Sequence, residues 1–501
     1  MKFQTTHAHD GSNHDMVVVF VASETKKPQY FFPPYIETKL QTYIKNIASK
    51  EHFEAKVGNI FHLHVAGTIP HILLVGIGEM QSLTMEDWLT AVASIGRDAV
   101  KRKIDHILIS SEAISQETVT VFHVGQGIAL GMRLGTYTFD TYKKKKHDHD
   151  ITSVTVSVET SHEKEVQDGI AQGMIISDSV VFTRDLVNTP ASETTPTYLA
   201  TVAQSIAKKS PLLTCTVYGP KELARMKMGG LLGIARGSRE EPRFIELLYK
   251  GGGKKTVVLV GKGITFDTGG LSLKTQDGME TMKIDMAGGA AILGIFQALA
   301  AFKLPINVIG LIPATENMPG SNAIKPGDVV RAYDGTTIEV INTDAEGRVI
   351  LADALSYAVA TYHPDTLIDL ATLTGACEVA LGEDIAGLFS TDKTLRDALL
   401  FASSQTGEPL WELPLPKTYE KKLESPIADV ANVTKTRWGG AITAALFLKT
   451  FVPDGHPWAH LDIAGPVYAE VDQPLAPIGA TGYGVRLMLQ YLFSIASYTI
   501  G

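Results

Sequence analysis

A short charged segment most constrains the expected fold. It lies between an apolar strand and a long apolar helix and reads Asn342-Thr343-Asp344-Ala345-Glu346-Gly347-Arg348. Its two carboxylates are two residues apart, so on an extended segment they would point to the same side. The glycine and arginine follow at the place where a helix N-terminus binds anions. The segment therefore predicts a strand-to-helix junction that carries chemistry.

A second group of charged residues lies upstream. It consists of Lys262, Asp267, Lys274 and Asp285. Lys262 follows an expected strand at 256–260, Asp344 follows one at 337–341, and Thr372 follows one at 366–370. Ligand sites of open α/β sheets lie beyond the carboxyl ends of their strands. We therefore expect three strand ends of one sheet to meet at one crevice.

Strands and helices alternate along the chain, which predicts an α/β protein. A long helix is expected at 165–187, and Asn188-Thr189-Pro190 should end it. This helix suggests two domains. We expect a smaller N-terminal α/β domain (1–163), a linker helix (164–190) and a larger catalytic α/β domain (191–501) with a central, mostly parallel sheet. The expected strands are 16–21, 71–78, 106–110, 213–218, 244–249, 256–260, 306–312, 337–341 and 366–370, and the other expected helices are 36–49, 84–101, 119–135, 287–302 and 348–362.

Composition excludes several classes of protein. The net charge of −9 argues against a general polyanion-binding surface. The two cysteines, Cys215 and Cys377, cannot build a disulfide framework, so a reducing compartment is expected. We see no secretory signal and no run approaching a membrane span of about 18 apolar residues. The expected location is the cytoplasm, with no membrane partner.

The four carboxylates of Asp267, Asp285, Asp344 and Glu346 suggest a two-metal site. Like charges brought this close cannot all stay ionised without compensation. Two divalent cations would cancel four negative charges, as in two-metal hydrolytic sites. Twelve of the fifteen histidines lie at or before His162, so any metal in the second part must be held mostly by oxygen. Isolated surface acids remain the alternative for any single residue.

The cationic residues have separate expected roles. Lys262 is an ordinary ion-pairing lysine or, if it loses its proton beside two cations, a metal ligand. Lys274 is either a surface lysine or a donor to an oxyanion. Arg348 either pairs with a buried carboxylate or, together with Gly347 and the helix amides, holds a small anion such as bicarbonate. That anion could accept a proton from attacking water.

Four further residues are candidates for substrate binding. Met282 and Leu373 would line a specificity pocket, or else belong to the core. Asn342, which begins the charged segment, and Thr372, which follows the strand expected at 366–370, complete the set. Rival motifs are missing from the sequence: there is no HExxH, no GxSxG and no GxxxxGK followed by serine or threonine. Gly125-Gln126-Gly127 lacks the third glycine of a dinucleotide site.

Several stretches together resemble the cytosolic leucyl aminopeptidase family. The likeness is strong from about residue 180 to 490, and the segment 342–348 is its most specific part. The matching stretches are Val260-Gly261-Lys262-Gly263-Ile264-Thr265-Phe266-Asp267-Thr268-Gly269-Gly270, Lys274, Met282-Lys283-Ile284-Asp285-Met286, the segment 342–348, and Trp458-Ala459-His460-Leu461-Asp462-Ile463-Ala464-Gly465-Pro466.

This resemblance implies a two-metal aminopeptidase with a macro-domain-like N-terminal domain. One metal would be held by Asp267, Asp344 and Glu346, and the other by Lys262, Asp267, Asp285 and Glu346. A metal-bridging hydroxide would attack the first peptide carbonyl, Lys274 would polarise that carbonyl, and Arg348 would hold bicarbonate as a proton shuttle. The pocket would favour leucine or other apolar first residues. The family also implies zinc, manganese or magnesium, and a homohexamer.

Two other functions compete with this interpretation. A two-metal phosphoesterase is weaker, because such enzymes more often recruit histidines. A DNA-binding protein would depend on Lys143-Lys144-Lys145-Lys146, a run that is more simply a solvated loop, although some bacterial members of the family bind DNA. The neighbouring His147-Asp148 and His149-Asp150 pairs could in principle hold a stray metal.

Overall fold

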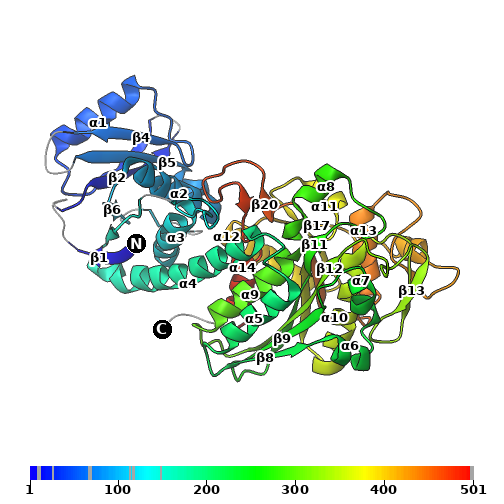
Figure 1. Cartoon of the computed structure of the whole chain (residues 1–501). Helices are drawn as coiled ribbons and strands as arrows, with labels where there is room; N and C mark the ends of the chain where they lie inside the picture. Colours follow the sequence, from blue (N-terminus) through cyan, green and yellow to red (C-terminus); the bar gives the residue numbers. More distant parts are fainter. Residues whose placement is uncertain are drawn as a thin grey trace.

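The structure, a computed structural model, describes residues 1–7, 13–24, 27–65, 70–111, 114–115, 119–146 and 149–496. Two α/β units lie side by side, and the long helix α4 (Glu163–Asn188) runs from one to the other (Figure 1). This arrangement matches the predicted α/β class and its two parts. The boundaries at residues 163 and 190 stay predictions. His147-Asp148, one of the two pairs considered for a stray metal, lies outside the described residues.

The N-terminal unit is built on a seven-stranded, mostly parallel sheet. Alternate residues of its central strand, Met16–Ser23, face opposite sides, as the pleat requires. Val17 and Val19 contact the core under α1 (Thr38–Lys50), whereas Val18 and Phe20 contact the core under α2 (Met85–Arg102) and α3 (Val121–Gly135). In spatial order the strands are β1 (Lys2–Thr6), β7 (Ser153–Ser157), β6 (His106–Ser110), β2 (Met16–Ser23), β5 (His71–Glu79) and β4 (Ile60–His64), with β3 (Gln29–Phe31) paired to β2.

The second unit is built on a nine-stranded mixed sheet. Its centre is parallel: β10 pairs in parallel with β12 and β15, and β15 pairs in parallel with β19. In spatial order the strands are β17 (Leu410–Glu412), β16 (Ala386–Ser390), β19 (Trp458–Asp462), β15 (Thr366–Ala371), β10 (Thr256–Gly261), β12 (Asn307–Asn317), β9 (Arg243–Lys250) and β8 (Leu213–Tyr218), with β11 (Gly263–Asp267) paired to β12.

Helices cover both faces of this sheet. Along β10, Val257 and Leu259 belong to the core that contains α9 (Ala287–Leu299), while Val258 and Val260 belong to the core that contains α10 (Glu346–Tyr362). Burial on both faces explains why such strands are continuous apolar runs. The remaining helices are α5 (Pro196–Ala207), α6 (Pro220–Met226), α7 (Gly229–Ala235), α8 (Gln276–Glu280), α11 (Gly375–Leu381), α12 (Lys393–Thr406), α13 (Gly440–Lys449) and α14 (Val485–Ala496).

Helix α4 contacts both units, and small residues let it approach closely. A Cβ on Gly169 would lie 2.1 Å from the main-chain oxygen of Phe122 in α3, and one on Gly294 of α9 would lie 2.1 Å from Thr183 Oγ1. Both distances are far below van der Waals contact. The helix therefore packs its N-terminal half on α3 and its C-terminal half on α9. One hydrophobic core continues through α3, α4 and α9.

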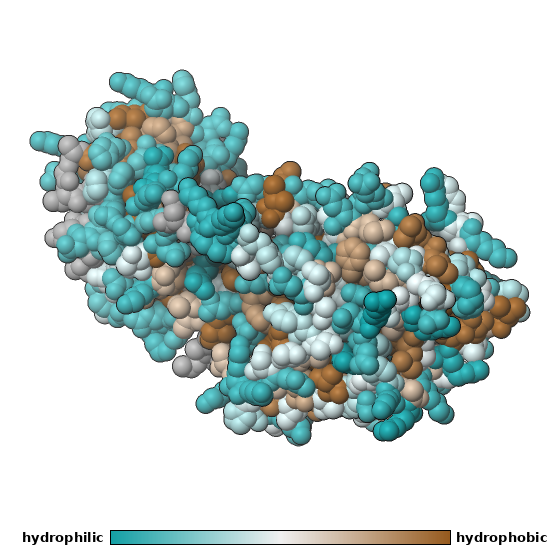
Figure 2. Space-filling model, in the orientation of Figure 1, coloured by the Kyte–Doolittle hydropathy of each residue, from teal (hydrophilic) through white to brown (hydrophobic). Residues whose placement is uncertain are grey.

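One helical stretch, Met282–Leu299, is long and apolar enough to cross a membrane by length and composition alone. The expectation that no segment approaches such a span is therefore wrong for this stretch. In the structure, 83% of it is buried inside the protein, where it packs between the sheet and α4. It is a core helix. Figure 2 shows hydrophilic side chains over most of the visible face of the N-terminal unit.

One prediction about the sheets is wrong. The strand before Asp344, β14 (Thr337–Val340), is not part of the nine-stranded sheet. It pairs with β13 (Asp328–Arg331) and β18 (Val430–Ala431) in a separate three-stranded sheet. Of the three strands whose ends were expected to meet in one sheet, only β10 and β15 share a sheet, in which they are neighbours. Strand order depends on long-range pairing, which an apolar run does not encode.

Two surface and redox expectations can also be compared with the structure. Cys215 and Cys377 are both free, as expected. Lys143 to Lys146 are exposed, and Lys146 Nζ donates to the main-chain oxygens of Asp140 (2.6 Å) and Thr141 (2.9 Å). The last lysine of the run is therefore folded back onto its own loop.

Candidate metal centre and active site

The predicted charged residues converge beyond the carboxyl end of β10. Lys262 directly follows β10, and Asp267 is the last residue of β11. Asp285 lies in a 3-10 turn, Met282–Met286, that precedes α9. Glu346 is the first residue of α10, and Asp344 lies in the turn before it. The two carboxylates of segment 342–348 thus leave from a turn and a helix, not from the extended segment that we expected.

Lys262 is at the centre of the group. Its Nζ lies 2.7 Å from Asp285 Oδ1 and 2.9 Å from Glu346 Oε1, and it donates to the main-chain oxygen of Thr372 at 2.9 Å. The three charged side chains are at most 5% exposed. Lys262 Nζ and the two carboxylate oxygens are therefore close enough to one another to coordinate the same metal ion. Together they form a buried polar cage at the end of the sheet.

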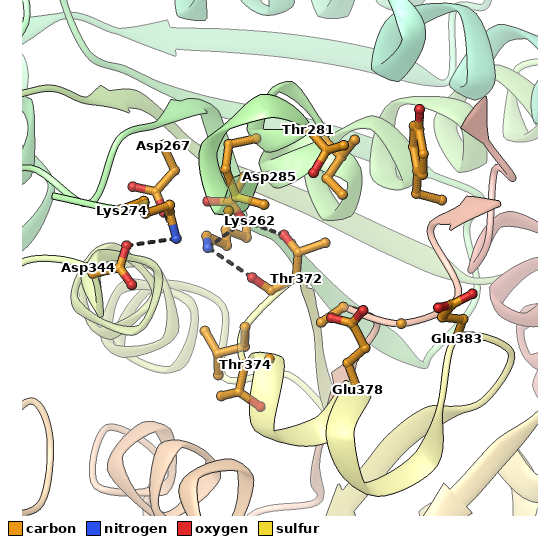
Figure 3. A pocket seen from close by; sticks show the side chains of 18 of the residues that line it. Lys262, Asp267, Lys274, Thr281, Asp285, Asp344, Thr372, Thr374, Glu378 and Glu383 are labelled. Carbon is orange, nitrogen blue, oxygen red and sulfur yellow. Dashed lines mark hydrogen bonds and ion pairs between the residues drawn. The ribbon is translucent and has the colours of Figure 1, made fainter. Parts of the chain in front are cut away.

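Lys274 forms the second half of this cage. Its Nζ lies 2.8 Å from Asp267 Oδ2 and 2.7 Å from Asp344 Oδ1, and Figure 3 shows the lysine between these two side chains. A tight turn brings Lys274 back to β11. Gly269 has a φ of +83°, and a Cβ there would lie 2.4 Å from the main-chain oxygen of Ser272, so only glycine fits.

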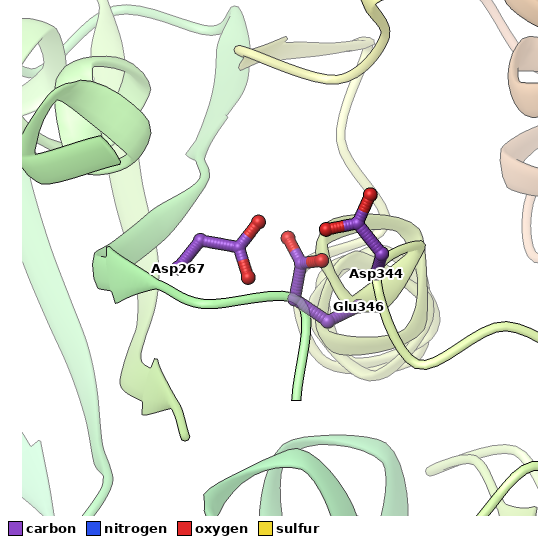
Figure 4. A group of neighbouring side chains, drawn as sticks. All are labelled: Asp267, Asp344 and Glu346. Atoms are coloured by element: carbon purple, nitrogen blue, oxygen red, sulfur yellow. The ribbon is translucent and has the colours of Figure 1, made fainter. Parts of the chain in front are cut away.

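The carboxylates fit divalent cations. One oxygen each of Asp267, Asp344 and Glu346 lies within 4.8 Å of the others. Figure 4 shows the three carboxylates facing one another. Asp285 Oδ2 and Glu346 Oε2 are buried and have no hydrogen-bond partner among the described residues. A buried carboxylate oxygen without a partner costs free energy unless a cation or a proton satisfies it. Hard oxygen ligands of this kind suit Mg²⁺, Mn²⁺ and Zn²⁺.

Burial and neighbouring charges shift the pKa values of several groups of the cage. Burial raises the pKa of both Asp285 and Glu346, and neighbouring carboxylates raise it further. Burial alone would lower the pKa of Lys262, but Asp285 and Glu346 outweigh it, so the pKa lies above the usual value. Strongly shifted pKa values in a buried cluster of charged groups are typical of functional sites. A cation in the cage would favour ionised carboxylates and would make it easier for Lys262 to lose its proton.

Arg348 and Gly347 lie in the first turn of α10. Arg348 is 7% exposed, and its Nη1 donates to the main-chain oxygen of Asn432 at 2.8 Å. Its Nε has no hydrogen-bond partner within the described part of the chain. Burial lowers its pKa to about 10. A Cβ on Gly347 would lie 2.5 Å from Lys262 Cε, so any larger residue here would have to displace the Lys262 side chain. The arginine keeps an unused donor beside a helix N-terminus.

The other predicted residues divide into two groups. Met282, Thr372 and Leu373 line the pocket above the cage. Asn342 does not: its Oδ1 accepts from the main-chain N–H of Asp344 at 2.9 Å and stabilises the turn. Its assignment to substrate binding stays a prediction, as do the roles of all the site residues.

Sequence reasoning missed two supporting residues. Asn317, the last residue of β12, donates from Nδ2 to Asp267 Oδ1 at 2.7 Å. Asp462, the last residue of β19, accepts from Thr374 Oγ1 at 2.6 Å and from the N–H of Leu373 at 3.1 Å. Both are polar residues at the ends of strands in the nine-stranded sheet. The strand-end rule that found Lys262 did not reach them, because the strand expected at 306–312 stops short of Asn317 and no strand was expected at 458–462.

Comparison with known proteins identifies the family. The catalytic-domain model of the cytosol aminopeptidase family matches residues 181–489, and the model of its N-terminal domain matches residues 17–146. The chain belongs to the cytosol aminopeptidase family. Membership confirms the resemblance found in the sequence and the two-domain α/β architecture. It makes the chain a metal-dependent exopeptidase of the leucyl aminopeptidase type, which hydrolyses peptides at the N-terminus.

Individual relatives cover almost the whole chain. It is 43% identical over 452 residues to a probable cytosol aminopeptidase of Geobacter sp. (strain M21), covering 89% of this chain and 90% of that protein. It is 41% identical over 457 residues to that of Aquifex aeolicus (strain VF5), covering 90% and 91%. Among solved structures, the bottromycin maturation enzyme BotP is 34% identical, with a TM-score of 0.84 over 97% of this chain and 100% of that chain. The same enzyme in complex with Mn has a TM-score of 0.85 at 34% identity and covers 96% and 100%.

Proposed function

We propose that this protein removes leucine, or another apolar first residue, from peptides with the help of two divalent cations. The observation that carries the proposal is the buried cage beside Lys262, in which two carboxylate oxygens have no hydrogen-bond partner among the residues that the structure describes. One cation would be held by Asp267, Asp344 and Glu346, and the other by Lys262, Asp267, Asp285 and Glu346. We propose zinc or manganese, with magnesium as a further candidate; one solved relative is a complex with Mn.

Such cations, when bound, lower the pKa of water and polarise a carbonyl oxygen. Lys274 supplies a fixed positive charge at the same place. Asp267 and Asp344 hold its ammonium group, and their charges outweigh the effect of burial, so its pKa lies above the usual value and the lysine stays charged. A preorganised cation stabilises the oxyanion that develops on the first peptide carbonyl, without reorganisation during the reaction. Hydrolysis then releases the first residue and the shortened peptide.

Apolar lining supports the preference for leucine. Met282, Ile284 and Leu373 line the pocket next to the charged cage. An apolar first side chain that packs against them gains free energy roughly in proportion to the area it buries. Thr372 also lines this pocket and contributes its main-chain oxygen to the cage.

Bicarbonate is the proposed proton shuttle, held by Arg348 and the N–H groups around Gly347. The support is the unused Nε of Arg348 beside the start of α10. We expect Arg348→Gln to lower kcat by about a hundredfold, since losing a proton-transfer group typically costs this much. More specifically, bicarbonate added to carbonate-depleted buffer should accelerate the wild type and leave the variant unchanged. An equal response of both proteins to bicarbonate would refute the role of Arg348.

The function itself is tested with two chromogenic substrates. Leucine-p-nitroanilide should be hydrolysed after addition of Mn²⁺, and p-nitrophenyl phosphate should not, because the cage has no histidine and a lysine faces the carbonyl. A chelator should bring the rate to background, and Mn²⁺ or Zn²⁺ should restore it. Phosphatase activity without peptidase activity would favour the two-metal phosphoesterase that the sequence left open.

Some properties of the assembled protein belong to the same proposal. We propose that the protein acts in the cytoplasm on peptide substrates, as the names of its relatives suggest. A homohexamer remains the expected assembly, and sedimentation or light scattering would test it. The domain division into 1–163, 164–190 and 191–501 is proposed on the same grounds.

A further inference from the structure

Three histidines lie together on β4 and β5, two antiparallel strands of the N-terminal unit (Figure 1). His62 and His64 are alternate residues of β4, so their side chains share one face of the sheet. His71 of β5 is paired directly with His64 and lies diagonally across from His62. Leu63 and Ile72 point to the opposite face and belong to the core under α1. We call His62, His64 and His71 the histidine cluster.

Two ring nitrogens of the cluster have almost the separation that a shared metal ion requires. His71 Nδ1 lies 3.0 Å from His62 Nε2, and the centroids of the two rings are 4.9 Å apart. Two nitrogens bound to one tetrahedral zinc ion, each at about 2.0–2.1 Å from it, lie about 3.3 Å from each other. A shift of about 0.3 Å would therefore let both rings bind the same ion.

His64 supplies the third ring of the cluster. Its centroid lies 5.0 Å from that of His71. His64 is exposed, whereas His62 and His71 are partly buried. Exposed side chains change rotamer within nanoseconds, so His64 can turn a ring nitrogen toward the other two. Three imidazoles would leave the fourth position of a tetrahedral ion to water.

No other interaction in the described part of the chain occupies these three rings. Apart from the contact between His62 and His71, their side chains make no hydrogen bond or ion pair with a described residue. Burial lowers the pKa of His62 and of His71, so both rings are uncharged at neutral pH. Uncharged imidazole is the form that binds metal ions. The cluster therefore has free ligand capacity.

The charged neighbours of the cluster allow a cation to bind. Asp98 and Arg102 of α2 act on both His62 and His71, and Asp15 also acts on His71. Arg102 Nε lies 2.9 Å from Asp98 Oδ1, so these two charges largely cancel. Asp15 adds a negative charge on the side of His71. The surroundings are therefore close to neutral or slightly negative.

We propose that the histidine cluster binds one transition-metal ion of the zinc, copper or nickel class, at a site separate from the catalytic cage. Imidazole ligands suit these ions, whereas Mg²⁺ and Mn²⁺ prefer oxygen ligands such as those of the cage. The bound ion would join β4 to β5. Since β4 is the last strand of the seven-stranded sheet, the ion would fasten an edge of that sheet. It takes no part in peptide hydrolysis.

The test counts metal ions on the full chain. Wild type and His62→Gln/His71→Gln are dialysed against the same free concentration of Zn²⁺, and bound zinc is measured by mass spectrometry. Wild type should hold about one zinc ion per chain more than the double variant, because the cage ligands are the same in both proteins. His64→Gln should bind this ion at least about tenfold more weakly, since even loss of an outer-shell partner typically costs that much.

A second measurement needs no variant. Diethyl pyrocarbonate modifies free imidazole nitrogens, and peptide mapping locates the modified residues. Zn²⁺ should protect His64 in wild type, whereas Mg²⁺ should not. His162 is the reference, because it is an exposed histidine of the same unit outside the cluster, 4.0 Å from Glu159. It should react equally with and without Zn²⁺, and His162→Gln should keep the full zinc count.

Several results would overturn the proposal. Equal zinc counts in wild type and a folded double variant would do so, as would an unchanged zinc affinity of His64→Gln. Should the double variant fail to fold, an unprotected His64 in zinc-loaded wild type decides against the site. An equal loss of zinc in His162→Gln would mean that surface histidines bind zinc without a built site. Hydrolysis of leucine-p-nitroanilide should be the same in all these proteins, and the zinc count stays valid even if no hydrolysis is found.

Discussion

Asp344→Asn is expected to lower kcat/KM for leucine-p-nitroanilide by about a hundred- to a thousandfold. The substitution keeps the size of the side chain and removes one of the three carboxylates whose oxygens lie within 4.8 Å of one another. It also removes the charge that lies 2.7 Å from Lys274 Nζ. Loss of a proposed metal ligand, together with displacement of Lys274, the proposed oxyanion donor, should give an effect of this size.

Metal content should separate this effect from unfolding. We expect the variant to retain about one of two divalent ions per chain, because Lys262, Asp285 and Glu346 remain in place. Asp454→Asn is the matched control. The Asp454 side chain is 98% exposed, and its one ion pair with the described residues is a long one, 3.9 Å from Oδ1 to Lys449 Nζ, so losing its charge should have little effect. The control should keep both metals and full activity. An Asp344→Asn protein that is fully active with two metals would contradict the proposed mechanism.

Gly347→Ala should lower activity by about a hundredfold without changing any charged group. The added methyl group would lie 2.5 Å from Lys262 Cε and 2.7 Å from its Nζ, so the lysine has to move by more than 1 Å. A displacement of this size at a reacting centre typically costs about a hundredfold in rate. Overpacking at a buried site should also lower the free energy of unfolding by about 1–3 kcal/mol. Steady-state kinetics and thermal unfolding measure the two effects.

Gly375→Ala provides a matched control within the same pocket. A Cβ on Gly375 meets no atom within 4 Å, so the same methyl group finds open space there. We expect normal metal content and normal stability for this control, with at most a change in KM, because Gly375 lines the pocket. Gly347→Ala should instead lose metal, since Lys262 is displaced from Asp285 and Glu346. Equal metal content in the two variants would argue against a role of Gly347 in the cage.

The sequence predicted much of this site because its polar and charged residues lie directly after recognisable strands or at the start of a recognisable helix. Lys262 and Thr372 follow β10 and β15, whose apolar runs are unmistakable because both faces of the strands are buried. Segment 342–348 carries two acids, a glycine and an arginine at a helix start, a combination with few purely structural uses. Asn317 and Asp462 escaped notice because a single polar residue after a strand is common. Their roles became visible only when their hydrogen bonds to the cage and to the 372–374 loop were known.

Other features were decided by the tertiary structure alone. An apolar strand does not specify its neighbours, so the placement of β14 in a separate sheet could not be read from its residues. Glu378 and Glu383, on and just after α11, line one pocket with Glu470, which follows β20 (Tyr468–Ala469) and comes from a segment far along the chain.

The chain by itself thus determined the α/β class, the family and the charged residues of the cage. These follow from local periodicity and from short motifs, whose physical effects act between residues close in sequence. The folded structure decided which strands share a sheet, which carboxylates lie within ligand distance and what surrounds the pocket. Those properties depend on contacts between segments far apart in the chain, whose free energies are not encoded at any single position.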